Sequence, residues 1–149
     1  MAITTDTASC PPEAVFSVLA NGWLYASWVV GASRIRGVEP AWPAQGSRIH
    51  HSFGVWPALI NDSTSVLEYD PPHRMVLKAR GWPLGSARVV LEVEPTADGC
   101  RMVIDEDAVE GPGLLVPKPA RSALIQVRNV ETLRRLRYLA EGHVAGRPA

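Results

Sequence analysis

Residues 99–141 read "GCRMVIDEDAVEGPGLLVPKPARSALIQVRNVETLRRLRYLAE" and contain the change of pattern on which the fold depends. Residues 100–109 alternate apolar and charged side chains, which is typical of a strand with one covered face. The linker at 111–119 is rich in proline and glycine. Residues 120–141 then contain neither glycine nor proline, which predicts a long C-terminal helix.

The chain before this stretch divides into a short, partly helical part and a longer part made of strands. Residues 3–9 predict a first strand of small and β-branched side chains. A helix is expected over 10–20, with Ser9 or Cys10 at its cap, and a second short helix over 23–30. Short turns then join further strands into an antiparallel meander, with strands at 32–39, 46–55, 58–69, 73–80, 86–94 and 100–109.

Composition indicates one globular domain with its own core. The chain has 149 residues, 46% hydrophobic, and its 15 basic residues balance 15 acidic ones, so we expect no binding to nucleic acid. No apolar run is long enough to span a membrane, and the first residues lack a signal-peptide pattern. With two cysteines only, we predict a cytoplasmic protein with reduced thiols. The domain is expected over 1–141, and 142–149 as a flexible tail.

Alternation along the strands predicts which side chains face the interior. Four strands, 46–55, 73–80, 86–94 and 100–109, each have an apolar face and a charged face, as in a sheet covered on one side. Strand 58–69 carries polar side chains on both faces, so the pattern does not tell which of its two faces points inward.

The long helix carries apolar side chains on two different arcs. One arc holds Val130, Leu133, Leu136 and Ala140, and the other holds Ala123 and Val127. A simple amphipathic helix has a single apolar stripe, so the first half of this helix is expected to face something other than close-packed core. Its solvated face is expected to carry the arginines Arg128, Arg134, Arg135 and Arg137.

Two ionisable residues, His51 and Glu106, lie on the predicted apolar faces. Burying either without a partner costs free energy or shifts its pKa. His51 is interpreted as a core histidine bonded to a neighbour, as a ligand contact, or as a general acid or base. Glu106 is interpreted as an exposed or capping carboxylate near the strand end, or as a polar group of a pocket.

The sequence lacks the usual catalytic and nucleotide-binding signatures. It contains no G-x-S-x-G, Walker or dinucleotide-binding pattern, and no C-x-x-C or H-E-x-x-H. His50 and His51 are neighbours on a strand and point to opposite faces, so they cannot bind one ion together. We therefore expect no metal and no cofactor.

The order of strand, two short helices, meander and long helix resembles the helix-grip fold of the START-like superfamily, also called SRPBCC or polyketide cyclase/dehydrase-like. The resemblance spans nearly the whole chain and is carried by "CPPEAVFSVLANGWLYASWV" (10–29), "GCRMVIDEDAVEGPG" (99–113) and the final helix. It implies an α+β fold in which a curved antiparallel sheet of about seven strands grips the helix, with an apolar cavity between them. Relatives include lipid carriers, hormone receptors, cyclases and chaperone activators, so the fold does not define the function.

Our main hypothesis is the binding of one small apolar molecule, lipid-like or similar to an aromatic polyketide, in this cavity. The predicted walls are Phe53, Met75, Leu77, Val89, Leu91 and Ile104. His51 and Glu106 supply the polar groups. Tyr25 and Trp28 close the side near the short helices, and the mouth consists of Trp56, Trp82, Leu115 and Val127.

Two other hypotheses remain open. One is an enzyme of the cyclase, aromatase or hydrolase type that uses the same cavity, with His51 or Glu106 as acid or base. The other is a stress-linked interaction protein that uses the outer face of the sheet; this face looks charged and scattered rather than patch-like. The pattern makes no prediction of oligomeric state.

Overall fold

The structure is a computed structural model that describes residues 2–54, 59–81 and 85–144. Its elements follow the predicted order along the chain. They are β1 (Ala2–Ala8), α1 (Pro12–Ala20), the 3-10 turn η1 (Gly22–Leu24), α2 (Tyr25–Trp28), β2 (Ala32–Val38), β3 (Arg48–Phe53), β4 (Ile60–Asp70), β5 (Arg74–Gly81), β6 (Gly85–Thr96), β7 (Gly99–Glu110), the 3-10 turn η2 (Pro112–Leu115) and α3 (Lys118–Val144).

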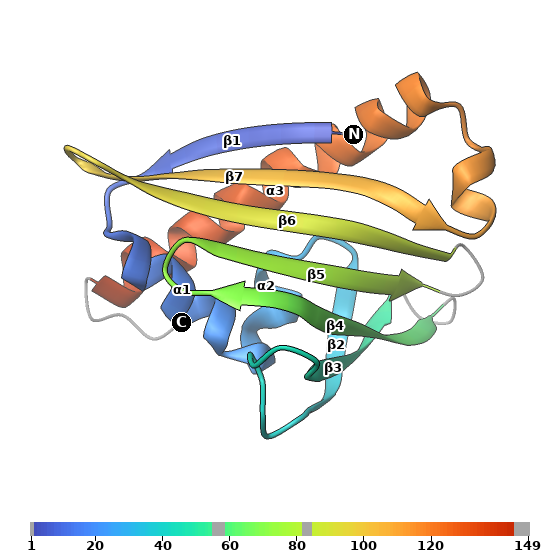
Figure 1. Cartoon of the computed structure of the whole chain (residues 1–149), viewed down its shortest axis with the longest axis horizontal. Coiled ribbons are helices and arrows are strands. Elements are labelled where there is room, and N and C mark those ends of the chain that lie inside the picture. The colour runs from blue at the N-terminus through green and yellow to red at the C-terminus, as the bar shows by residue number, and fades with distance from the viewer. Residues whose placement is uncertain (1, 55–58, 82–84, 145–149) are drawn as a thin grey trace.

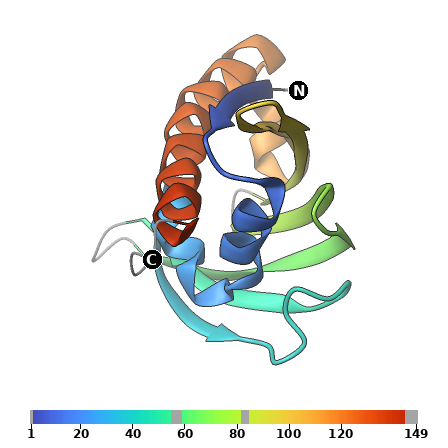
Figure 2. The same cartoon turned by 90° about the vertical axis from the view of Figure 1, so that its left-hand side faces the viewer.

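The seven strands form one antiparallel sheet in the order β1-β7-β6-β5-β4-β3-β2. The first strand therefore pairs with the last, with Ala2 opposite Glu106 and Ala8 opposite Cys100. The three α-helices lie on the same side of the curved sheet, and α3 crosses behind it (Figures 1 and 2), packed against β1, β7, α1 and α2. This arrangement confirms the predicted α+β helix-grip fold.

Element boundaries differ from the predictions mainly at the helices. The N-cap of α1 is Pro11, without a side-chain hydrogen bond, in place of the expected Ser9 or Cys10. Helix α3 begins at Lys118 because a proline in the first turn, here Pro119, displaces no intrahelical hydrogen bond. It continues to Val144, so residues 142–144 are helical and were wrongly placed in the tail.

The core lies between the concave face of the sheet and the helices α1, α2 and α3. The predicted inward residues Ile49, Met75, Leu91 and Ile104 are all buried, as strand alternation requires. On α3 the buried side chains are Asn129, Thr132, Leu133, Leu136 and Ala140. Val130 is exposed, contrary to the predicted arc, because Asn129 takes the inward position one residue earlier.

The register of β4 answers the question of which face of this strand points inward. His51 lies opposite Asp62, and Ile49 lies opposite Thr64. Directly opposed residues of antiparallel strands share a face, so Asp62, Thr64 and then Val66 are on the inner side. A polar threonine therefore sits in the core next to His51.

No helix in the described part of the chain is long and apolar enough to cross a membrane.

Cys10 and Cys100 are both buried and free. Burial is the main cause that raises the pKa of the Cys10 thiol to about 12.

Candidate functional site

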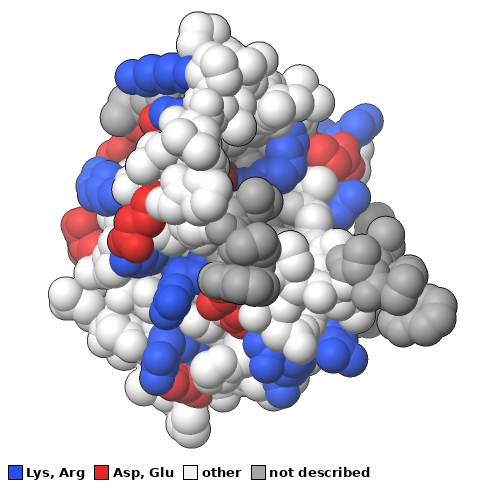
Figure 3. Space-filling view, turned by 90° about the vertical axis from the view of Figure 1, so that its right-hand side faces the viewer, with Lys and Arg blue, Asp and Glu red and all other residues white. Residues whose placement is uncertain are grey.

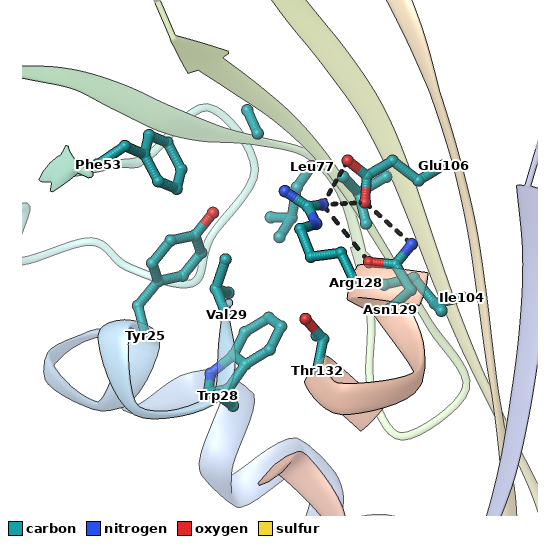
Figure 4. A pocket seen from close by; sticks show the side chains of 12 residues that line it. Tyr25, Trp28, Val29, Phe53, Leu77, Ile104, Glu106, Arg128, Asn129 and Thr132 are labelled. Carbon is teal, nitrogen blue, oxygen red and sulfur yellow. Dashed lines mark hydrogen bonds and ion pairs between the residues drawn. The ribbon is translucent and has the colours of Figure 1, made fainter. Parts of the chain in front are cut away.

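Two adjacent hollows lie between the sheet and α3. The inner cavity, shown in Figure 4, encloses about 30 Å³ beside Tyr25 and Trp28. That volume suits about one water molecule. The outer groove encloses about 400 Å³ and lies beneath η2 and the first turns of α3. Phe53, Ala79, Glu106 and Arg128 line both hollows, so these residues mark the junction between them.

The outer groove exists because three small side chains meet across neighbouring strands. Ala79 on β5 lies opposite Ala87 on β6, which lies opposite Ala108 on β7. The next row toward the core, Leu77, Val89 and Glu106, is larger, and it forms the wall of the inner cavity. The alanine methyl groups extend only a short way from the sheet, and the side chains of Leu124 and Ile125 on α3 do not fill the space above them.

Glu106 is buried and forms an ion pair with Arg128 at this junction. Glu106 is only 4% exposed. The Nη2 group of Arg128 donates to both carboxylate oxygens, and Asn129 Nδ2 donates to Oε1 at 3.1 Å (Figure 4). These donors offset the cost of removing the carboxylate from water. Glu106 is thus a pocket residue by position, and not an exposed or capping carboxylate.

His51 is fully buried behind the inner cavity. Its Nε2 lies 2.8 Å from Thr64 Oγ1, which lies 3.0 Å from the Tyr25 hydroxyl. The imidazole stacks on the Tyr25 ring at 5.6 Å and meets the Phe53 ring edge-on at 4.4 Å. Burial lowers the pKa of His51 to about 4, so the ring is neutral at pH 7, and its Nδ1 has no partner among the described residues.

The rim of the outer groove is held by a second ion pair. Arg121 Nε donates to Asp107 Oδ1 at 2.7 Å, and Arg121 Nη1 donates to the carbonyl oxygen of Val116 at 2.9 Å. The guanidinium keeps the pKa of the Asp107 carboxyl well below its usual range. One side chain thereby ties the start of α3 and the preceding linker to β7.

The predicted site residues fall into four groups. Six of them line the inner cavity beside Glu106: Tyr25, Trp28, Phe53, Leu77, Val89 and Ile104. Three are buried but line neither hollow: His51, Met75 and Leu91. Trp56 and Trp82 lie outside the described residues, so their predicted place at the mouth stays a prediction.

Leu115 and Val127 lie away from the groove, contrary to the predicted mouth. They are 85% and 75% exposed and line neither hollow. A helix turns by about 100° per residue, so Ile125 and Arg128 share one face while Val127 points to roughly the opposite side. The first half of α3 does line a cavity, but with a different face from the predicted one.

Sequence reasoning missed Arg128, which was expected on the solvated face of the helix. Arg134 and Arg135 do pair with Glu131 on the helix surface, as expected. Arg128 turns inward to Glu106, 22 positions away in the sequence. The available signal was Glu106 itself, because a carboxylate on an apolar strand face needs a buried cation or donor.

The face of the molecule in Figure 3 carries basic and acidic side chains interspersed with uncharged ones. Within residues 2–54, 59–81 and 85–144, no group of three or more His, Cys, Asp or Glu side chains could hold a metal ion.

Comparison with known proteins agrees with this architecture. Residues 2–141 match the family model described as polyketide cyclase / dehydrase and lipid transport. The solved structure of protein CV1439 from Chromobacterium violaceum is similar at a TM-score of 0.73 and 17% identity, covering 93% of this chain and 96% of the other. Protein NE0264 from Nitrosomonas europaea is similar at a TM-score of 0.69 and 18% identity, covering 96% of this chain and 95% of the other.

A third similar structure has a name that states an activity class. The di-domain ARO/CYC StfQ from the steffimycin biosynthetic pathway matches at a TM-score of 0.71 and 15% identity, covering 96% of this chain and 51% of StfQ. No curated protein sequence is significantly similar to this chain. Identities this low show a common fold alone, whereas the family match spans nearly the whole sequence. The chain therefore belongs to the polyketide cyclase/dehydrase and lipid transport family.

Proposed function

We propose that the chain binds a small hydrophobic molecule in the outer groove between the sheet and α3. The observation that carries this proposal is the groove of about 400 Å³ with mainly apolar walls. Pockets for small molecules are typically 300–1,000 Å³, largely apolar, with a few placed polar groups. The inner cavity of about 30 Å³ is too small for such a ligand and serves as the closed end of the site.

The family supports the same class of ligand. Its description joins polyketide cyclases and dehydrases with lipid transport, and lipids are largely apolar molecules. The groove of this chain is compatible with either an aliphatic or an aromatic body, since its walls are built from alanine, isoleucine, leucine and phenylalanine side chains.

Binding is tested with a ligand that has no polar group and with a variant that fills the groove. Equilibrium dialysis measures the Kd of 2-ethylnaphthalene, and native mass spectrometry of the purified protein searches for a co-purified small molecule. Ala87→Leu places a larger side chain in the middle of the alanine row and is expected to weaken binding about tenfold or more. Ala123→Leu, at an exposed position of α3, is the matched control and is expected to bind like the wild type.

The proposal fails if the wild type retains neither the probe nor any co-purified molecule. It also fails if Ala87→Leu binds the probe as tightly as Ala123→Leu does, because the probe then occupies another place.

A cyclase- or aromatase-type reaction in the same site is a second candidate. The observation that favours it is the chain of contacts from His51 through Thr64 to the Tyr25 hydroxyl, which lines the inner cavity. Through this chain a neutral His51 would orient the Tyr25 proton toward a bound carbonyl group. Incubation with a linear poly-β-ketone thioester mimic tests it: a cyclised product is expected from the wild type and not from Tyr25→Phe. Equal amounts of product from the two proteins would show that neither the Tyr25 hydroxyl nor His51 acting through it takes part in the cyclisation.

A further inference from the structure

The groove contains hydrogen-bond donors that the described residues of the protein do not use. A guanidinium carries five N–H donors. Among the described residues, Arg128 donates only from Nη2, to Glu106 and Asn129, and its buried Nε has no acceptor. Ser86 Oγ, also at the groove, is buried and equally without a partner in the described chain. These two atoms are closed off from solvent, but the Arg128 side chain is 36% exposed and its Nη1 group donates to no described residue. Nη1 is therefore the donor left for a polar group on the molecule that fills the groove.

Arg128 is placed to meet such a group. It lines both hollows, and Figure 4 shows its guanidinium and the Tyr25 hydroxyl pointing into the pocket from opposite sides. A ligand body lying along the alanine row would therefore present its inner end to Arg128. Tyr25 stays protonated, because burial raises its pKa to about 12, and its hydroxyl adds a second polar atom to the same end of the site.

The charges around the groove are already paired. Arg128 faces Glu106, Arg121 faces Asp107, and Arg80 Nε lies 3.8 Å from Asp62 Oδ1. A ligand carboxylate would lose its hydration without meeting an uncompensated cation, which is strongly unfavourable. A neutral carbonyl oxygen can accept a hydrogen bond from Arg128 while the Arg128–Glu106 pair stays intact.

We propose that the Arg128–Glu106 pair is a charge filter: the site takes apolar molecules that carry an uncharged acceptor oxygen, as in a ketone, ester or amide, and rejects carboxylates. This inference rests on the proposed function and adds the chemistry of the ligand's polar end. It separates neutral carbonyl compounds from free fatty or aromatic acids of the same size.

Three probes with the same ring system test the filter by equilibrium dialysis: 2-ethylnaphthalene, 2-acetylnaphthalene and 2-naphthoate. The wild type is expected to bind the ketone roughly 10- to 100-fold more tightly than the hydrocarbon, as a hydrogen bond from a charged donor provides. The carboxylate is expected to bind more weakly than the ketone.

Changing Glu106 should reverse the selectivity. In Glu106→Gln, Arg128 becomes an uncompensated cation, so the carboxylate is expected to bind more tightly than the ketone. In the double variant Glu106→Gln/Arg128→Met both charges and the donor are absent, so the ketone should lose its advantage over the hydrocarbon. Arg134→Met, which removes an exposed arginine of the same helix, is the control and keeps the wild-type order.

The outcomes separate the two proposals. If the hydrocarbon binds but the ketone binds no more tightly, or Glu106→Gln keeps the wild-type order, the charge filter is wrong and the apolar site stands. If the single variants do not fold, the double variant still decides, since a retained ketone preference there would also refute the filter. If none of the three probes binds the wild type, the charge filter is wrong, and the proposed function is wrong as well when no small molecule co-purifies.

Discussion

The Arg128–Glu106 pair makes a sharp prediction about stability. Arg128→Met removes the cation and leaves Glu106, 4% exposed, with Asn129 as its remaining side-chain donor among the described residues. Breaking one partner of a buried ion pair costs about 3–5 kcal/mol. The Arg128 side chain is 36% exposed, so water reaches one side of the pair and the lower end, about 3 kcal/mol, applies. For a chain of this length that corresponds to a fall in Tm of about 6–12 °C.

The assay is urea and thermal unfolding of the wild type, both single variants and the double variant. Replacing both partners with uncharged side chains of similar size is expected to restore most of the stability, because the amide oxygen that Glu106→Gln introduces can still accept from Asn129. The control Arg134→Met acts on an exposed pair and should change the Tm far less than Arg128→Met does. The reasoning is refuted if Arg128→Met lowers the free energy of unfolding no more than Arg134→Met does, or if the double variant is as unstable as Arg128→Met.

Three further predictions concern groups outside this pair. Because burial lowers the pKa of His51 to about 4, protonation favours the unfolded chain; the free energy of unfolding should fall as the pH drops from about 6.5 to 4, and NMR should show no His51 titration near pH 6.5. Cys10, with its pKa raised to about 12, should react slowly with a disulfide reagent at pH 8 and quickly in urea; fast reaction of both thiols in the native protein would contradict its burial. Arg121→Met should lower the Tm and speed amide exchange in the first turns of α3, whereas unchanged exchange there would show that Asp107 and Val116 do not hold that end.

The inner face of the sheet and the length of the last helix follow from local pattern. Alternation places Met75, Leu91 and Ile104 on one face because successive strand residues point to opposite sides, whatever the neighbouring strands are. The absence of glycine and proline over residues 120–141 is also a local property. Strand alternation alone predicted five of the inner-cavity residues, Glu106 among them, whereas the helix-grip architecture was inferred from the order of the elements and the family resemblance.

The site itself depended on how distant segments meet. The inward face of β4 was set by its pairing with β3, which brings Thr64 to His51, because the strand's own polar residues do not distinguish its two faces. Rotation of α3 against the sheet decided that Arg128, and not Val127, turns inward, since a local apolar pattern does not determine the angle at which a helix docks. The groove arises where alanines from three strands share one row, a coincidence of register that exists only in the folded sheet.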